Sequence, residues 1–299
     1  MAVVPGWLWW GLLPAGLALL HLFHRRLRVS LAAPRVPIAY SLDEHGVTGE
    51  TVTIPTRRDR RLAGWWLPAT PGRGSVVITH GWGANRELML PLARPLQAAG
   101  WNMLLFDARN HGESDAESFS SMPRFAEDTE AALDWLRARP GMAEEPVALL
   151  GHSVGAAAVL LAASRRDDIA AVVSLSAFAH PDGMMRRWLA EKGLPFFPLG
   201  WYVLRYVERV IGHRFDAIAP VTTLPRVRCP VLLVHGRNDE VIPPSDAERL
   251  LASRGDTPAE LRLLPGDHDL SLHIDAELPE LLAFLDKALA PEGRERRPA

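Results

Sequence analysis

The residues best suited to chemistry in this chain centre on a serine. Ser153 lies in the middle of Gly151–Gly155, which reads Gly-His-Ser-Val-Gly and separates the apolar run Val147–Leu150 from an Ala- and Leu-rich segment. Such five-residue strings arise by chance, but G-x-S-x-G between a strand and a helix is typical of a nucleophile elbow, where small neighbours permit a sharp turn. The helix that follows would direct its free N–H groups at the atom under attack. We therefore predict Ser153 as a nucleophile.

A serine hydroxyl needs a base to take its proton and a third group to orient that base. Asp239 follows the apolar run Val231–Val234, and His268 lies in a Gly-containing turn after Leu261–Leu264. The chain order serine, acid, histidine is the one expected after a nucleophile elbow. We predict Asp239 as the acid and His268 as the base, with His273 as the second choice of base. A turn aspartate and an exposed loop histidine are the ordinary alternatives.

The negative charge that develops on a carbonyl oxygen under attack needs two N–H donors. Val154 follows the nucleophile, and its N–H is the first candidate. The second candidate is the N–H of Trp82, in the His-Gly-Trp-Gly sequence after the apolar run Val76–Thr79. The Trp82 side chain can also form a wall of the pocket, although simple packing explains it equally well.

The elements that must position these residues read as alternating strands and helices. Val47–Ile54 and Leu62–Leu67, joined by the turn Arg57–Arg61, indicate an antiparallel hairpin. Short apolar runs and helically spaced segments then alternate, which predicts a mostly parallel, eight-stranded sheet flanked by helices, an α/β fold. The runs are Val76–Thr79, Met103–Phe106, Val147–Leu150, Ala171–Leu175, Val231–Val234 and Leu261–Leu264, and the helical segments are Glu87–Ala99, Pro123–Arg139, Val154–Ser164, Ser245–Arg254 and Ala276–Ala290.

One connection is much longer than the usual few residues. About fifty residues separate Ala177 from Val231, and many of them are aromatic or apolar, as in Phe196–Tyr206. We interpret this insertion as a helical cap whose apolar face covers a substrate pocket. The alternative is that these side chains only attach the insertion to the body.

The N-terminal segment is a separate element. Between Val3 and Phe23 there is no Asp, Glu, Lys or Arg; three tryptophans lie near its start, and Arg25–Arg28 follow its end. About twenty apolar residues with such flanks suit a transmembrane helix, and no basic region precedes them as in a signal peptide. We predict an uncleaved, single-pass membrane anchor rather than a buried soluble helix. The arginines then place the catalytic domain in the cytoplasm.

Composition excludes several other classes. The 299 residues carry a net charge of −2, which gives no electrostatic reason to bind nucleic acid. The single cysteine excludes an intrachain disulfide. The sequence contains no His-Glu-x-x-His motif, Cys/His cluster or dinucleotide-binding glycine loop, so we expect no metal and no organic cofactor.

Four motifs in the correct order look like those of the α/β-hydrolase fold superfamily, and more narrowly its membrane-anchored, Bem46-like and serine-aminopeptidase-like members: His80–Gly83, Phe106–Ser114, Gly151–Gly155 and His235–Pro243. The resemblance extends from about Val47 to Leu289. It implies the α/β-hydrolase fold and a bracing role for Asp107–Ser114. Relatives use the same triad on esters, thioesters, amides and peroxyacids, so the resemblance specifies mechanism better than substrate.

These observations predict a serine hydrolase that cleaves a carboxylic ester with a lipid-like or other apolar acyl group through an acyl-enzyme. A peptidase, amidase or thioesterase with the same triad is the alternative, and a non-catalytic, membrane-tethered binding module is a third reading. The expected partners are a small-molecule acyl substrate and a membrane. The predicted domains are a membrane anchor at 1–28, a linker at 29–46, the α/β-hydrolase domain at 47–290 with its cap at about 178–229, and a polar tail at 291–299.

Overall fold

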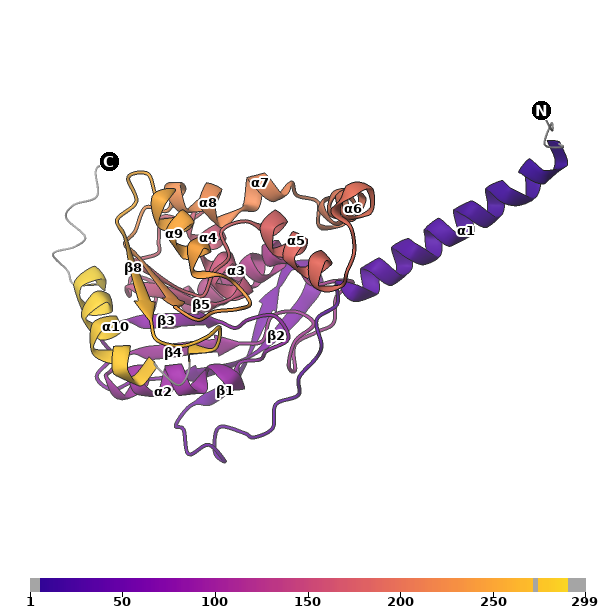
Figure 1. The fold of residues 1–299 in the computed structure, drawn as a ribbon. Coiled ribbons are helices and arrows are strands. Elements are labelled where there is room, and N and C mark those ends of the chain that lie inside the picture. The colour runs from indigo at the N-terminus through magenta and orange to yellow at the C-terminus, as the bar shows by residue number, and fades with distance from the viewer. Residues whose placement is uncertain (1–5, 271–273, 290–299) are drawn as a thin grey trace.

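The computed structural model describes residues 6–270 and 274–289 and shows one eight-stranded sheet between layers of helices (Figure 1). The strands are β1 (Glu50–Thr56), β2 (Arg60–Leu67), β3 (Ser75–Thr79), β4 (Asn102–Phe106), β5 (Val147–His152), β6 (Ala171–Leu175), β7 (Val231–Gly236) and β8 (Ala259–Leu264). Their order is β1-β2-β4-β3-β5-β6-β7-β8; β2 runs antiparallel to β1 and β4, and the other neighbouring strands are parallel. The predicted mostly parallel, eight-stranded sheet is confirmed.

The hairpin at the edge of the sheet has the predicted antiparallel pairing, in which Glu50 lies opposite Trp66 and Thr56 opposite Arg60. Its turn requires a left-handed backbone, with Arg58 at φ 60°. Side chains of β1 alternate between buried and exposed positions because only one face of this edge strand meets the core.

Strands in the middle of the sheet are buried on both faces, which explains their continuous apolar sequences. Val77 and Leu104 pack on the side of α3 and α4, whereas Val76 and Met103 pack on the side of α2 and α10. Figure 1 shows these helix layers on either side of the sheet. The helices of the body are α2 (Leu90–Ala98), α3 (Met122–Arg137), α4 (Val154–Ala163), α9 (Pro244–Ala252) and α10 (Ile274–Leu289).

The long insertion after β6 is helical, as the sequence predicts. It contains α5 (Pro181–Glu191), α6 (Trp201–Ile211), α7 (Phe215–Ile218) and α8 (Pro220–Thr223). In Figure 1 these helices lie along the upper side of the molecule. Their buried apolar side chains, among them Leu189 and Leu204, belong to the same core as α3 and α4.

The N-terminal segment forms helix α1 (Gly6–Ser30), which extends away from the body (Figure 1). Its last turns pack on the cap: the imidazole of His24 lies 2.6 Å from the Tyr202 hydroxyl, and Arg28 Nε donates to the Tyr206 hydroxyl at 2.8 Å.

The predicted transmembrane span is not supported. Across the described ranges, no helix is both long enough and apolar enough to cross a membrane. In the last turns of α1, His24 and Arg28 form hydrogen bonds with α6. Residues 1–5 of the predicted anchor and the predicted tail 291–299 lie outside the described residues.

Candidate active site

Ser153 occupies the sharp turn between β5 and α4, with φ 56° and ψ −119°. This positive φ is strained for a residue with a side chain. The flanking glycines make the turn possible, because a Cβ on Gly155 would lie 2.3 Å from the Thr79 carbonyl oxygen. A Cβ on Gly151 would meet the Gly155 carbonyl oxygen at the same distance, 2.3 Å. The predicted strand, turn and helix around Ser153 are therefore present.

The structure brings Ser153, His268 and Asp239 into one hydrogen-bonded chain. His268 Nε2 lies 3.0 Å from Ser153 Oγ, and His268 Nδ1 lies 2.8 Å from Asp239 Oδ2. Asp239 follows β7 and His268 follows β8, so the parallel strands deliver both residues to the edge of the sheet where β5 ends. Because Asp239 accepts the proton on Nδ1, Nε2 is left free to accept the serine proton.

The Asp239 carboxylate is held in its ionised form. Its side chain is buried, and Oδ1 accepts the N–H groups of Val241 and Ile242 at 2.9 and 2.7 Å. Burial alone would raise the pKa of Asp239, but hydrogen bonds from His235, His268 and the Ile242 N–H outweigh it and hold the pKa well below its usual range. Asp239 therefore stays negative over the working pH range of most enzymes.

His235 is a contact that the sequence reasoning did not assign. Its Nε2 lies 3.2 Å from Asp239 Oδ2 and 2.8 Å from the Ile242 carbonyl oxygen, and the ring is buried. In the sequence, its position at the end of a predicted strand and four residues before Asp239 could have indicated this role. His235 fixes the loop that presents the carboxylate.

His152 supports the loop that carries the base. Its Nε2 lies 2.9 Å from the His268 carbonyl oxygen, and Ser176 Oγ donates to the same oxygen at 3.4 Å. Burial lowers the pKa of His152, so the ring is neutral and Nε2 is the protonated nitrogen that donates. The alternative base, His273, lies outside the described residues.

The two predicted oxyanion donors both neighbour Ser153. Val154 is the first residue of α4, and Trp82 follows Gly81, where an added Cβ would lie 3.3 Å from Ser153 Cβ. In the part of the chain that the structure describes, the N–H groups of Trp82 and Val154 have no acceptor. Both amides are thus available to a substrate oxygen.

A buried histidine holds the loop that carries Trp82. His80 Nδ1 donates to the Gly81 carbonyl oxygen at 2.7 Å, and Nε2 accepts the Ala108 N–H at 3.0 Å. Complete burial lowers the pKa of His80 to about 3, so the ring is neutral at pH 7. The loop after β3 is in this way fixed to the loop after β4.

Asp107 braces the same region. Its carboxylate accepts the N–H groups of Arg86 and Glu113 at 2.7 and 2.9 Å and forms a buried ion pair with the Arg86 guanidinium. The guanidinium also lies 4.6 Å from the centre of the Trp65 ring. These contacts agree with the bracing role that the resemblance implies for Asp107–Ser114.

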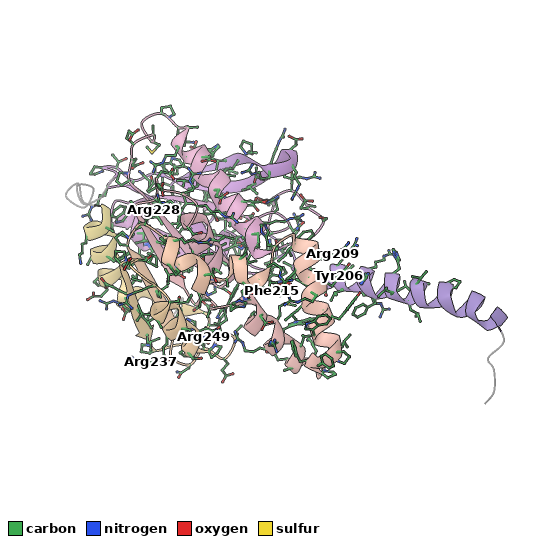
Figure 2. The ribbon with its side chains drawn as sticks, turned by 90° about the horizontal axis from the view of Figure 1, so that it is seen from above. Tyr206, Arg209, Phe215, Arg228, Arg237 and Arg249 are labelled. Atoms are coloured by element: carbon green, nitrogen blue, oxygen red, sulfur yellow. The ribbon has the colours of Figure 1, made fainter. Side chains whose placement is uncertain are left out.

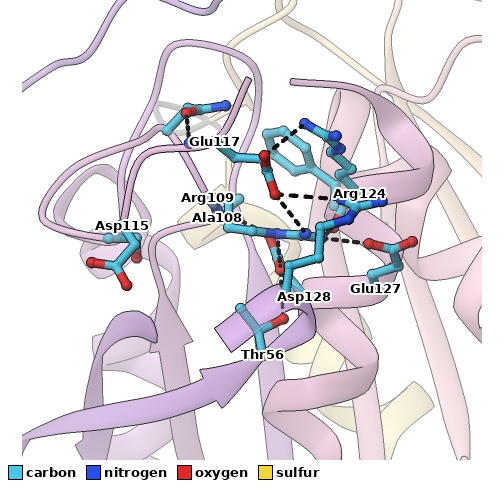
Figure 3. Close-up of polar contacts among 12 residues, drawn as sticks. Thr56, Ala108, Arg109, Asp115, Glu117, Arg124, Glu127 and Asp128 are labelled. Carbon is cyan, nitrogen blue, oxygen red and sulfur yellow. Dashed lines mark hydrogen bonds and ion pairs between the residues drawn. The ribbon is translucent and has the colours of Figure 1, made fainter. Parts of the chain in front are cut away.

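A second polar network lies between β1 and α3 (Figure 3). Arg109 Nε donates to Asp128 Oδ1 at 2.7 Å, Nη2 donates to Glu127 at 2.6 Å, and Thr56 Oγ1 donates to Asp128 at 2.9 Å. Burial raises the pKa of Asp128 to about 6, against the opposing attraction of Arg109. None of these residues belongs to the described lining of the cavity beside Ser153, so the network is part of the scaffold.

An apolar cavity of about 500 Å³ opens beside Ser153 and His268. Met184 and Trp188 of α5 line it, so part of the predicted cap does cover a pocket. The expectation fails for Phe197 and Trp201, whose side chains are 77% and 51% exposed on the outside. The other apolar lining residues are Leu27, Leu31, Trp82, Met122, Pro123, Val154, Phe178, Pro181, Met185, Val207, Ile211, Phe215, Ile218 and Val241.

Two of the lining residues, Leu27 and Leu31, come from the end of α1 and the residue just after it. The sequence assigned this segment to a membrane anchor and its linker, so their place in the cavity was missed. The described residues contain no group of three or more His, Cys, Asp or Glu side chains that could hold a metal ion.

Comparisons with known proteins identify the family and the fold of the chain. The family model described as serine aminopeptidase, S33, matches residues 70–212. An uncharacterised protein of Mycobacterium tuberculosis strain H37Rv is 31% identical over 264 residues, which cover 88% of this chain and 84% of that protein. The chain belongs to the serine aminopeptidase (S33-like) family of α/β hydrolases.

This S33-like hydrolase is also 28% identical over 257 residues to the uncharacterised protein YfhR of Escherichia coli K12, covering 82% of this chain and 84% of that protein. The Pyrococcus furiosus esterase Pf2001 superposes with a TM-score of 0.71 at 20% identity, over 86% of this chain and 100% of that one. The α/β hydrolase GrgF of Penicillium superposes with a TM-score of 0.64 at 22% identity, over 82% and 100%. At these identities the two structures establish the α/β-hydrolase fold alone.

Proposed function

We propose that this protein is a serine hydrolase that cleaves carboxylic esters with an apolar acyl group. The observation that carries the proposal is the hydrogen-bonded chain from Ser153 Oγ through His268 to Asp239, which opens onto an apolar cavity. A nucleophile, its base and an ionised orienting acid in this geometry perform acyl transfer on several unrelated folds.

In the first half of the proposed reaction, Ser153 Oγ attacks the ester carbonyl carbon while His268 Nε2 takes the hydroxyl proton. The N–H groups of Trp82 and Val154 stabilise the oxyanion. Asp239, already negative, stabilises the imidazolium. His268 then gives the proton to the leaving alkoxide, and the acyl-enzyme forms.

In the second half, a water molecule replaces the alcohol. His268 takes one proton from the water, and the hydroxide attacks the acyl carbon. The tetrahedral intermediate collapses, Ser153 regains its proton from His268, and the carboxylic acid leaves. This sequence uses no metal ion and no organic cofactor.

The chemistry of the cavity favours esters over amino-terminal peptides. An aminopeptidase must bind the positive α-ammonium of its substrate, which calls for a nearby carboxylate. The described lining of the cavity contains no Asp or Glu. The structural likeness to an enzyme named an esterase points in the same direction.

Ester hydrolysis and its dependence on acyl chain length test the proposal. With p-nitrophenyl esters, kcat/KM should rise roughly fourfold for each added methylene until the cavity is full, since each buried CH₂ contributes about 0.8 kcal/mol. Ser153→Ala should lower kcat at least about 10³-fold. Faster cleavage of aminoacyl amides than of these esters would contradict the substrate class, and activity near wild type in Ser153→Ala would contradict the mechanism.

A matched pair of variants locates the acyl chain. Met184→Trp adds volume inside the cavity and should shift the preferred ester to a shorter chain. Leu88→Trp makes a similar change at a side chain that is 56% exposed and does not line the cavity, and should leave the preference unchanged. Equal shifts in both variants would mean that the acyl chain binds elsewhere.

A further inference from the structure

Helix α6 has two different faces. Val207 and Ile211 face the apolar cavity beside Ser153. Tyr206 and Arg209 instead line a second, open cleft of about 840 Å³ between α6 and the last turns of α1. Figure 2 shows Tyr206 and Arg209 on the side of the body from which α1 extends.

The cleft carries an excess of positive charge. Four arginines line it against a single glutamate, Glu208. Glu208 is buried: Oε1 accepts the Phe215 N–H at 2.8 Å, and Oε2 forms ion pairs with Arg205 Nη1 at 2.9 Å and Arg214 Nη1 at 3.5 Å. Two arginines therefore share one carboxylate, and the other two, Arg28 and Arg209, pair with no carboxylate in the described part of the chain.

Both arginines have N–H donors without an acceptor among the described residues. Arg28 donates through Nε to the Tyr206 hydroxyl, and this bond orients the guanidinium while its two Nη groups remain without an acceptor among the described residues. The exposed Arg209 has no acceptor in the same ranges. A planar guanidinium with free N–H groups matches the geometry of phosphate oxygens.

We propose that this cleft binds a phosphate group through Arg28 and Arg209. Charge-assisted N–H···O bonds from the two guanidinium groups would hold the phosphate oxygens. Arg205 and Arg214, which pair with Glu208, also line the cleft and add to its positive charge. The site is separate from Ser153 and requires nothing of the serine chemistry.

The surroundings favour a phosphate that belongs to an anionic phospholipid rather than to a soluble ester. Exposed apolar side chains lie on the two elements that form the cleft: Leu17 and Leu20 on α1 are 61% and 42% exposed, and Trp201 on α6 is 51% exposed. A lipid that placed its phosphate in the cleft could lay its acyl chains along these side chains. A small phosphate ester would leave them uncovered.

Two binding experiments on the full chain distinguish the sources of the phosphate. Sedimentation with vesicles of phosphatidylcholine, with and without phosphatidylglycerol, measures binding to a lipid phosphate. Calorimetry with glycerol 3-phosphate measures binding to a soluble one. We expect binding that depends on phosphatidylglycerol and weakens with added salt.

A charge reversal and its matched control localise the binding. Arg209→Glu should weaken vesicle binding roughly tenfold or more, because each arginine near an anionic surface contributes about a fivefold increase in affinity. Arg237→Glu makes the same change at an exposed arginine on the opposite side of the body (Figure 2) and should have little effect. Thermal unfolding of both variants shows whether they are folded.

Each outcome of these experiments either supports or overturns the proposed lipid site. Phosphatidylglycerol-dependent binding that Arg209→Glu removes and Arg237→Glu preserves supports the lipid site. Suppose that the protein binds glycerol 3-phosphate, that Arg209→Glu loses this binding, and that vesicle binding does not depend on phosphatidylglycerol. This result supports the phosphate site and overturns the lipid as the source of the phosphate. Absence of both kinds of binding, or an equal loss in both variants, overturns the proposal.

Discussion

Two buried aspartates of this molecule differ in what their partners can do. Asp239 faces the imidazole ring of His268, at the edge of the apolar cavity. Asp128 faces the guanidinium of Arg109, between β1 and α3 and away from that cavity (Figure 3). The pKa of Asp239 lies below its usual range, whereas that of Asp128 is raised to about 6 by burial.

This difference distinguishes an aspartate that can take part in a reaction from one that only stabilises the fold. A histidine beside a carboxylate can gain and lose a proton, so the pair can take part in proton transfer. An arginine keeps its charge at every accessible pH, so its pairing with a buried carboxylate can only hold elements together. Burial of an acid is therefore a poor guide to function unless the partner and the neighbouring cavity are known.

The largest expected effect is on catalysis by Asp239. In Asp239→Asn the amide can no longer stabilise the imidazolium or hold the reactive tautomer of His268. We expect kcat to fall about 10⁴-fold on p-nitrophenyl esters. The thermal unfolding midpoint should change little by comparison. A loss of less than about tenfold in kcat would remove Asp239 from the mechanism.

The same substitution at Asp128 should lower stability and leave kcat nearly unchanged. Asp128→Asn leaves the buried Arg109 with Glu127 and the more distant Glu117, and breaking a buried pair costs about 3 kcal/mol or more in free energy of unfolding. Urea denaturation measures this loss. The folded fraction should keep kcat within a few-fold of wild type; a selective loss of kcat with normal stability would erase the contrast between the two aspartates.

A pH-dependent effect on stability concerns the buried histidine under the Trp82 loop. The pKa of His80 falls from 6.5 to about 3 on folding, so the unfolded chain takes up a proton first as the pH drops. Stability from this group is complete above pH 6.5 and is lost between pH 6.5 and about 3, by about 1.4 kcal/mol per pH unit.

His80→Gln keeps a donor and an acceptor but does not titrate, so it should flatten the decline of the free energy of unfolding over this pH range. The decline should not vanish, because burial also lowers the pKa of His111 and His152. Urea denaturation at a series of pH values measures the slope. An unchanged slope in His80→Gln would show that His80 is accessible to protons in the folded state.

Local patterns in the sequence predicted a large part of this structure. Apolar runs located the strands, and Gly151 and Gly155 located the turn at Ser153, because a tight turn and a buried strand each leave their mark within a few residues. The candidate triad residues could be chosen by chain order and by their positions after β7 and β8. The structure places them within hydrogen-bond distance of one another.

Contacts between distant segments could not be predicted in this way. His24 and Tyr202 are 178 positions apart, and nothing in the local sequence of either indicates that α1 packs on α6. The apolar sequence of a helix indicates that its surface is covered, but it does not indicate whether a membrane or another part of the protein covers it. For the same reason Leu27 and Leu31 were assigned to an anchor and its linker, although they line the cavity.

The most direct test of the proposed chemistry is the site of covalent modification by a fluorophosphonate, which reacts with activated serines. The full chain would be labelled, digested and analysed by mass spectrometry, with Ser153→Ala as the control. We predict a single adduct on the peptide that contains Ser153 and none in the variant. An adduct on another serine, or no adduct on folded protein, would contradict the assignment of Ser153 as the nucleophile.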